Sequence, residues 1–453
     1  MSQLYTYSDP VLSLWQAAVA EVHRRHNSIS QSMGRAASST ARASKLLDQD
    51  ALMAPARSLG ATVKAGKPVP ALPSLELAAQ TAVGGAIVDC AKTAGEFLIA
   101  EITGNHQKSD ILAGELKDSV CDVGWSECVI TYLAYKASLQ SLPYRPNQDP
   151  VIELEDRTKL AILGDWGTGD DVAINLLKQV AGFGPDVLIH LGDIYYAGTH
   201  SEEQGNFLDI CRHTLSQSVL IVSLCGNHDM YSGGQGYYWL VDQLGQQASY
   251  FCLRNANWQF LAMDTGHNDN NPLTVATNMT KLVTYGTWAE ENWLLDKINL
   301  AAANQKTVLL SHHQLFSPFA SVGTVNGQDY AYNPNLRATF QAVMSKIALW
   351  FWGHEHTLAM FDAYMGLQRG RCVGASAVPV FTDQQSHTNG TGLETYGGAP
   401  LPTWNSKVQL GNNGTSYNNC FAIMTLKGAS ATVDYYQVPI GGAAQKFPVS
   451  DSV

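Results

Sequence analysis

Five short segments of the chain carry carboxylate, amide and imidazole side chains directly after apolar runs. They are "GDWG" (164–167), "GDIYY" (192–196), "GNHD" (226–229), "SHHQ" (311–314) and "GHEH" (353–356). Each pattern alone has an ordinary interpretation as a turn or as a locally hydrogen-bonded group. Together, and in this order, they predict one site at which carboxylates, an amide and imidazoles bind metal ions.

The apolar runs that precede these segments predict buried β-strands. The runs are "KLAIL" (159–163), "DVLIHL" (186–191), "VLIVSLC" (219–225), "WQFLAMD" (258–264), "TVLLS" (307–311) and "ALWFW" (348–352). Continuous apolar runs that alternate with helical stretches are typical of α/β proteins, whose strands are buried on both faces. Because ligands bind beyond the carboxyl ends of such strands, we expect the five segments to converge on one site.

The two ends of the chain differ from this central pattern. Residues 1–150 have helical periodicity in several stretches and predict a helical N-terminal region that caps the pocket, binds a partner or mediates oligomerisation. The Pro-containing segment 142–150 predicts a linker at its end. A catalytic domain is expected over 151–440, closed by the strand-like runs "CFAIMTL" and "ATVDYYQV" and followed by a C-terminal tail, 441–453.

Composition limits the classes of partner. The chain has 453 residues and a net charge of −11, so nucleic acid is not an expected partner and an anionic substrate must be attracted locally. The longest apolar stretch, 77–102, carries several charged residues and does not predict a transmembrane segment. The eight cysteines form no CxxC pair, which favours free buried thiols. The N-terminus lacks the features of a signal peptide, which slightly favours a cytoplasmic location over a secreted or periplasmic one and leaves the location open. The oligomeric state is not predicted.

The five segments resemble the calcineurin-like metallophosphoesterase superfamily over about residues 158–365. The resemblance implies a four-layer α/β (α+β) sandwich, in which two packed β-sheets are flanked by helices and two metal ions lie at the strand ends. Most members of the superfamily have His two residues after the first Asp, where this chain has Gly167. The purple acid phosphatase branch has Gly there and a Tyr that aligns with Tyr196, so this branch is the most similar; Tyr195 is expected to pack.

The resemblance also implies the metal ligands. They are Asp165, Asp193, Tyr196 and His356 for the first metal, and Asp193, Asn227, His312 and His354 for the second, with Asp193 bridging. Gln314 stands where the family commonly has Pro, which leaves the choice between His312 and His313 open; His312 is favoured, and His313 is expected to face the substrate. A phenolate with carboxylates suits Fe(III), and the second set suits Zn, Fe(II) or Mn(II).

The implied activity is hydrolysis of a small phosphomonoester by a metal-bound hydroxide, as in an acid phosphatase. His228, oriented by Asp229, is expected to give a proton to the leaving group, and His313 completes the catalytic set. One alternative is a phosphodiesterase of the same fold, acting on a cyclic nucleotide, a nucleic-acid end or a lipid head group. An alternative of another class is a catalytically weak metal-binding scaffold. The loops 266–279, 320–334 and 382–398 are expected to select the substrate.

Overall fold

A computed structural model of the chain describes residues 135, 140–271, 278–378, 380, 382, 387–414 and 416–453. Most of the predicted helical region, 1–150, lies outside the described residues. Of the predicted linker, 142–150, Tyr144 is buried: it packs against the ring of Tyr250 and donates a hydrogen bond to Glu290. This segment is therefore anchored on the domain that follows it.

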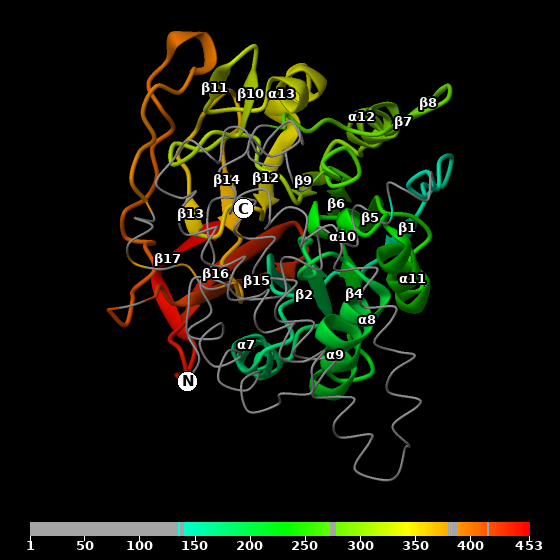
Figure 1. Cartoon of the computed structure of the whole chain (residues 1–453), viewed down its shortest axis with the longest axis vertical. Helices are drawn as coiled ribbons and strands as arrows, with labels where there is room; N and C mark the ends of the chain where they lie inside the picture. Colours follow the sequence, from blue (N-terminus) through cyan, green and yellow to red (C-terminus); the bar gives the residue numbers. More distant parts are fainter. Residues whose placement is uncertain are drawn as a thin grey trace, which may run out of the picture. The chain divides into compact units, whose positions relative to one another are not determined.

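The first sheet has six strands in the order β17-β16-β15-β2-β3-β4 (Figure 1). The strands are β2 (Lys159–Leu163), β3 (Val187–His190), β4 (Leu220–Ser223), β15 (Asn419–Lys427), β16 (Ser430–Val438) and β17 (Gln445–Ser452). Strands β2, β3 and β4 are parallel, and the other three pair antiparallel. The crossovers are α7 (Asp171–Ala181) from β2 to β3, and α8 (His200–Glu202), η1 (Glu203–Leu208) and α9 (Asp209–Thr214) from β3 to β4. Most of the segment predicted as a tail, 441–453, lies in this sheet as β17.

The second sheet has seven strands in the order β1-β5-β6-β9-β12-β14-β13. They are β1 (Val151–Glu153), β5 (Phe251–Arg254), β6 (Trp258–Ala262), β9 (Lys306–Ser311), β12 (Ile347–Trp352), β13 (Leu358–Met360) and β14 (Gly370–Val373). Strands β6, β9, β12 and β14 are parallel. Helix α12 (Glu290–Leu300) leads into β9, and α13 (Pro334–Phe340) precedes β12. Two hairpins complete this half: β7 (Thr284–Tyr285) with β8 (Trp288–Ala289), and β10 (Gly323–Val325) with β11 (Gln328–Tyr330).

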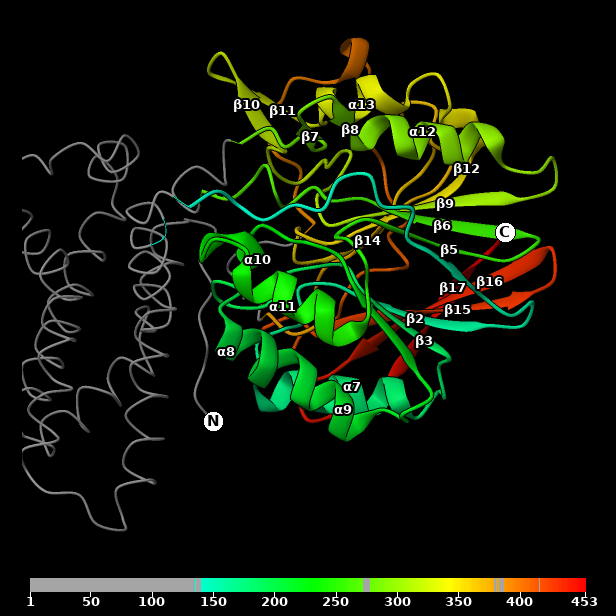
Figure 2. The ribbon, with the colours of Figure 1, turned by 90° about the vertical axis from the view of Figure 1, so that its right-hand side faces the viewer.

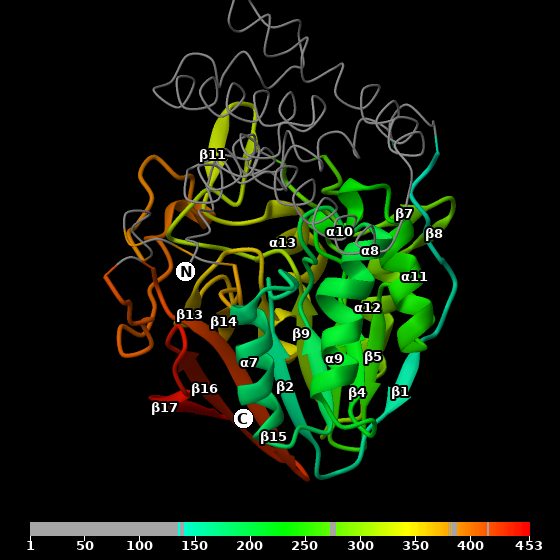
Figure 3. The same ribbon diagram turned by 60° about the horizontal axis from the view of Figure 1, so that its bottom comes forward.

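The two sheets pack face to face and helices cover their outer faces, which gives four layers. Figures 2 and 3 show α7 and α9 over the six-stranded sheet, and Figure 2 shows α12 and α13 over the seven-stranded sheet. In β12, Leu349 and Phe351 face the core between the sheets, whereas Trp350 and Trp352 pack under the outer helices. Because alternate side chains point to opposite faces, a strand covered on both sides is apolar throughout. The predicted metallophosphoesterase sandwich is confirmed.

The apolar stretch 77–102 and three of the eight cysteines, Cys90, Cys121 and Cys128, lie outside the described residues. The described cysteines, Cys211, Cys225, Cys252, Cys372 and Cys420, are buried and free. No helix in the described part of the chain has the length and hydrophobicity that a bilayer span requires.

Candidate metal centre

The predicted ligands lie at the carboxyl ends of parallel strands from both sheets. Asp165 follows β2, Asp193 follows β3, and His312 follows β9; their ligand atoms all lie within 4.8 Å of one another. Asp165 and Asp193 have positive φ angles of 56° and 73°, as does His354 after β12 with 63°. This conformation is uncommon for residues other than Gly and is found at strained functional turns. The chain thus leaves each strand abruptly and turns the side chain across the sheet edge.

The first group of converging atoms surrounds the ring of His312. Its Nδ1 lies 3.0 Å from the carbonyl oxygen of Leu191, which can only accept, so Nδ1 carries the proton and Nε2 presents a lone pair in the neutral ring. That Nε2 faces Oδ1 of Asn227 at 3.0 Å, Nδ1 of His354 at 3.1 Å and Oδ2 of Asp193 at 3.4 Å. One nitrogen cannot satisfy three such neighbours with a single proton, whereas a cation between them can.

The electrostatics of this group agree with a cation site. Burial opposes a charge on His312, yet the carboxylate of Asp193 raises the pKa of His312 to about 9. Burial and the neighbouring imidazoles hold the pKa of His354 well below its ordinary value. The Asp193 carboxylate thus favours positive charge at His312, whereas His354 is held in its neutral form, which can donate a lone pair to a cation. The donors Asp193, Asn227, His312 and His354 fit the second predicted metal.

The second group of converging atoms surrounds the hydroxyl of Tyr195. This oxygen lies 3.0 Å from Oδ1 of Asp165, 3.3 Å from Oδ2 of Asp193 and 3.2 Å from Nε2 of His356. Nε2 of His356 in turn lies 3.4 Å from Oδ1 of Asp165. The Tyr195 side chain is fully buried. Tyr195 was expected to pack, and the structure instead places its phenol oxygen among the donors predicted for the first metal.

Tyr196 follows Tyr195 in the chain, and its backbone contacts Glu202 and His228. Its N–H donates a hydrogen bond to Oε1 of Glu202, and its carbonyl oxygen lies 2.7 Å from Nδ1 of His228. Its ring meets that of Tyr195 edge-on, with centroids 6.1 Å apart. The tyrosinate role of Tyr196 therefore remains a prediction, and Tyr195 is a second candidate for the same role.

His228 and Asp229 both lie at the centre, but they make different contacts. Nε2 of His228 lies 3.8 Å from Oδ2 of Asp193, so this nitrogen faces the metal ligands. Asp229 accepts hydrogen bonds from the backbone N–H groups of Gly226 at 2.6 Å, Asp193 at 3.1 Å and Ile194 at 2.9 Å. Burial and the Asp193 carboxylate raise the pKa of Asp229 to about 8, against these three donors. Asp229 thus links the segment 192–196 to its own segment, 226–229. The Tyr196 carbonyl oxygen is a partner of the His228 ring.

His313 also lies at the centre: one ligand nitrogen each of His312, His313 and His354 lie within 4.8 Å of one another. Its Nδ1 lies 2.9 Å from Oγ1 of Thr265 and its Nε2 lies 3.0 Å from Oδ2 of Asp269. Its ring packs on that of His354, with centroids 4.3 Å apart. Burial raises the pKa of Asp269 to about 7. This residue belongs to none of the sequence motifs. Both ring nitrogens of His313 are engaged, so the geometry suits support of His354 better than contact with a substrate.

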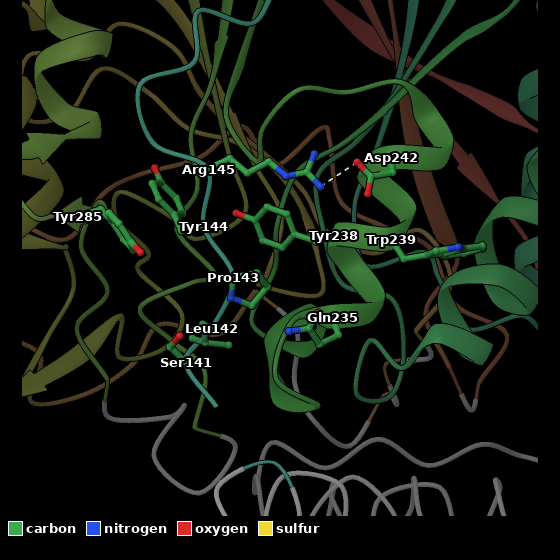
Figure 4. Close-up of a pocket in the computed structure, with 10 residues that line it drawn as sticks. All are labelled: Ser141, Leu142, Pro143, Tyr144, Arg145, Gln235, Tyr238, Trp239, Asp242 and Tyr285. Carbon is green, nitrogen blue, oxygen red and sulfur yellow. Dashed lines mark ion pairs between the residues drawn. The ribbon is translucent and has the colours of Figure 1, made fainter. Parts of the chain in front are cut away.

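A pocket of about 470 Å³ lies near the predicted linker (Figure 4). It is lined by Ser141, Leu142, Pro143, Tyr144, Arg145, Gln235, Tyr238, Trp239, Asp242 and Tyr285. Arg145 pairs with Asp242 at 2.8 Å and lies over the ring of Tyr238, 5.3 Å from its centroid. None of the predicted site residues lines this pocket, so it is not the candidate active site.

Two packed sheets with Asp and His donors at their strand ends define the metallophosphoesterase class. Residues 158–358 match the family model of the calcineurin-like phosphoesterases, and the chain therefore contains a calcineurin-like metallophosphoesterase domain. This family is generally made up of metal-dependent phosphoester hydrolases and typically has a dinuclear metal site.

Solved structures with a similar fold have low sequence identity to the chain. One is the purple acid phosphatase PPD1 from yellow lupin (Lupinus luteus) seeds, with 14% identity, 68% of this chain and 54% of that chain covered, and a TM-score of 0.42. Another is GAP50, the anchor in the inner membrane complex of Plasmodium, with 12% identity, 65% and 90% covered, and a TM-score of 0.40. The chain thus spans about half the length of the lupin enzyme. No curated protein matches the sequence.

Proposed function

We propose that the chain is a metal-dependent hydrolase of small phosphomonoesters, similar in activity to the purple acid phosphatases. The observation that carries this proposal is the position of the Asp193 carboxylate. Its Oδ2 lies 3.4 Å from Nε2 of His312 and 3.3 Å from the phenol oxygen of Tyr195, so one carboxylate faces both groups of donors. A carboxylate shared in this way is the element that a dinuclear centre needs.

The donor types support two different metal ions. Asp165, Asp193, His356 and one tyrosine would hold the first, for which Fe(III) is the proposed ion because a phenolate and carboxylates are hard ligands. Asp193, Asn227, His312 and His354 would hold the second, with Zn, Fe(II) or Mn(II) as the proposed ion. When bound, such a pair lowers the pKa of water and neutralises phosphoryl charge.

The local charge explains how an acidic chain would hold an anion. Two carboxylates and one phenolate carry less negative charge than a trivalent and a divalent ion carry positive charge. The metal-loaded centre would therefore have a local positive charge, although the net charge of the chain is −11. This favours a small phosphate ester over an extended polyanion.

His228 is the proposed proton donor to the leaving group. Because its Nδ1–H donates to the carbonyl oxygen of Tyr196, Nε2 is the nitrogen that gains and gives up a proton, and His228 acts as an acid when the ring is in its protonated form. Nε2 also lies on the side of Asp193, where the phosphoryl group would be held. General acids placed in this way contribute roughly 10² to 10⁴-fold to the rate.

The test compares p-nitrophenyl phosphate with bis-p-nitrophenyl phosphate as substrates, with measured metal content. Preferential, chelator-sensitive hydrolysis of the monoester is expected. Preference for the diester would favour a phosphodiesterase of the same fold, and metal binding without turnover would favour a scaffold. The Asp193→Asn variant is the matched control, since it should abolish turnover of either substrate.

The identity of the proposed tyrosinate is tested by visible absorption spectra of the wild type, Tyr195→Phe and Tyr196→Phe. An iron-loaded centre should show a tyrosinate-to-iron(III) charge-transfer band, lost only in the variant that lacks the ligand. Geometry favours Tyr195 and the family pattern favours Tyr196, so the two variants separate the hypotheses. A colourless wild type with two divalent ions would contradict both.

A further inference from the structure

The carboxylate of Glu202 gathers four hydrogen-bond donors from the turn that follows Asp193. Oε1 accepts from the N–H of Tyr196, and Oε2 accepts from the N–H of Ala197 at 3.2 Å. Oε2 also accepts from the N–H of Thr199 at 2.9 Å and from its hydroxyl at 2.8 Å. The Glu202 residue is 4% exposed. A buried carboxylate with this many donors forms strong, charge-assisted hydrogen bonds.

Part of this arrangement is an ordinary capping box. Thr199 is the N-cap of α8, its side chain accepts from the N–H of Glu202, and the Glu202 side chain reaches back to the Thr199 N–H. Such a box needs one bond in each direction. The additional bonds to the N–H groups of Tyr196 and Ala197 are not part of a cap. They fix the backbone between the metal centre and the helix.

One peptide group connects Glu202 to His228. The amide between Tyr196 and Ala197 donates its N–H to Oε2 of Glu202, and its carbonyl oxygen lies 2.7 Å from Nδ1 of His228. The N–H and C=O of a peptide share one resonance system, so a hydrogen bond at one end strengthens the acceptor at the other. The arrangement resembles a carboxylate that orients a histidine, with a peptide group inserted between the two.

We propose that Glu202 is a positioning residue that fixes the tautomer and ring orientation of His228 through the Tyr196–Ala197 peptide. With this peptide held, the Nδ1–H of His228 is committed to the carbonyl and Nε2 is directed at the metal centre. This proposal rests on the proposed function for its catalytic consequence, but its structural part does not depend on turnover. It gives Glu202 the orienting task that the sequence assigned to Asp229.

The test uses the Glu202→Gln variant in the full-length, zinc-loaded protein. ¹⁵N NMR of the His228 ring should show protonated Nδ1 in the wild type and a mixture of tautomers in the variant. In turnover, kcat should fall about 10 to 100-fold for alkyl phosphates, with a much smaller loss for p-nitrophenyl phosphate and an unchanged metal content. A good leaving group needs little help from an acid, so the difference between substrates reports on His228.

The matched control is Thr199→Ala, which removes the capping hydroxyl but leaves the Ala197 N–H bond to Glu202. It should lower the melting temperature and leave both the ring tautomer and the leaving-group dependence as in the wild type. A folded Glu202→Gln protein with wild-type ring shifts would overturn the proposal. Glu202→Asp, which keeps the charge but is too short, provides the same readout if Gln prevents folding. An inactive wild type would overturn the proposed function, while the NMR comparison would still decide the role of Glu202.

Discussion

Nε2 of His312 lies 3.1 Å from Nδ1 of His354, and the buried His312 ring and the partly buried His354 ring lie beside the Asp193 carboxylate. Two imidazole lone pairs at this separation repel unless a proton or a cation lies between them. We therefore predict that a chelator will lower the melting temperature and that Zn or Mn(II) will restore it. A ligand at 100 times its dissociation constant contributes about 2.7 kcal/mol to stability. Calorimetry with and without chelator measures the effect, and His312→Ala should respond little. Equal melting temperatures would argue against a structural contribution from the metal.

Asp193 is predicted to be the residue whose loss affects both metal sites together. It is 1% exposed, and its Oδ1 also accepts from the N–H of His228 at 2.9 Å. Asp193→Asn keeps the shape but removes the shared charge, so metal content should fall at both sites and kcat/KM should fall by roughly 10³-fold or more. Metal analysis of the purified variant measures this, with Asp296→Asn on the exposed surface as the charge control. Loss of one metal alone would contradict the bridging role.

Asp269 is predicted to support the second metal site through His313. It accepts from Nδ2 of Asn278 at 2.7 Å through Oδ1 and meets His313 through Oδ2. In Asp269→Asn the contact with Nε2 of His313 changes, and the ring that packs on His354 is less well held. Substitutions of such supporting residues typically cost 10 to 100-fold in metal affinity. Titration of the metal-depleted variant with Zn measures the change in metal affinity. An unchanged affinity for Zn would mean that the contact between Asp269 and His313 contributes only to packing.

The strands of the parallel core were predictable from sequence because burial on both faces leaves a continuous apolar run. The run "ALWFW" became β12, with Leu349 and Trp350 on opposite faces. Strand β17 was not predictable in this way because it pairs on one side only and its sequence, "QKFPVSDS", is mostly polar. Pro448 within it suits an edge strand.

The sequence predicts those residues of the site that belong to a recognisable motif. The five segments lie together, yet the sequence could not decide which of two adjacent phenols faces the metal ligands. That choice depends on the backbone after Asp193, which Glu202 and Asp229 hold from positions 9 and 36 residues further along the chain. Glu202 is recognisable in the sequence only as the last residue of a capping box and Asp269 belongs to no recognisable pattern, so only the folded chain brings them to the centre.

The last prediction concerns an ion pair that joins the two sheets. Arg371 on β14 forms two hydrogen bonds of 2.7 Å with the carboxylate of Asp451 on β17, and the hydroxyl of Tyr435 on β16 adds a third at 2.6 Å. Both members of the pair are buried. Removing one partner of a buried pair costs about 3–5 kcal/mol, so Asp451→Asn should strongly destabilise the fold at neutral pH.

The pH dependence of this pair has a definite sign. Burial alone would raise the pKa of Asp451, but the hydrogen bonds and charge of Arg371 hold that pKa below its ordinary value. A carboxyl whose pKa is lowered by folding stabilises the native state above its unfolded pKa of about 3.9, and this contribution is lost as the pH falls through the lower folded value. Urea unfolding between neutral pH and about pH 3 should therefore show a steeper acid loss in the wild type than in Asp451→Asn. Parallel curves would mean that the pair does not set the acid sensitivity, and Asp296→Asn should follow the wild type.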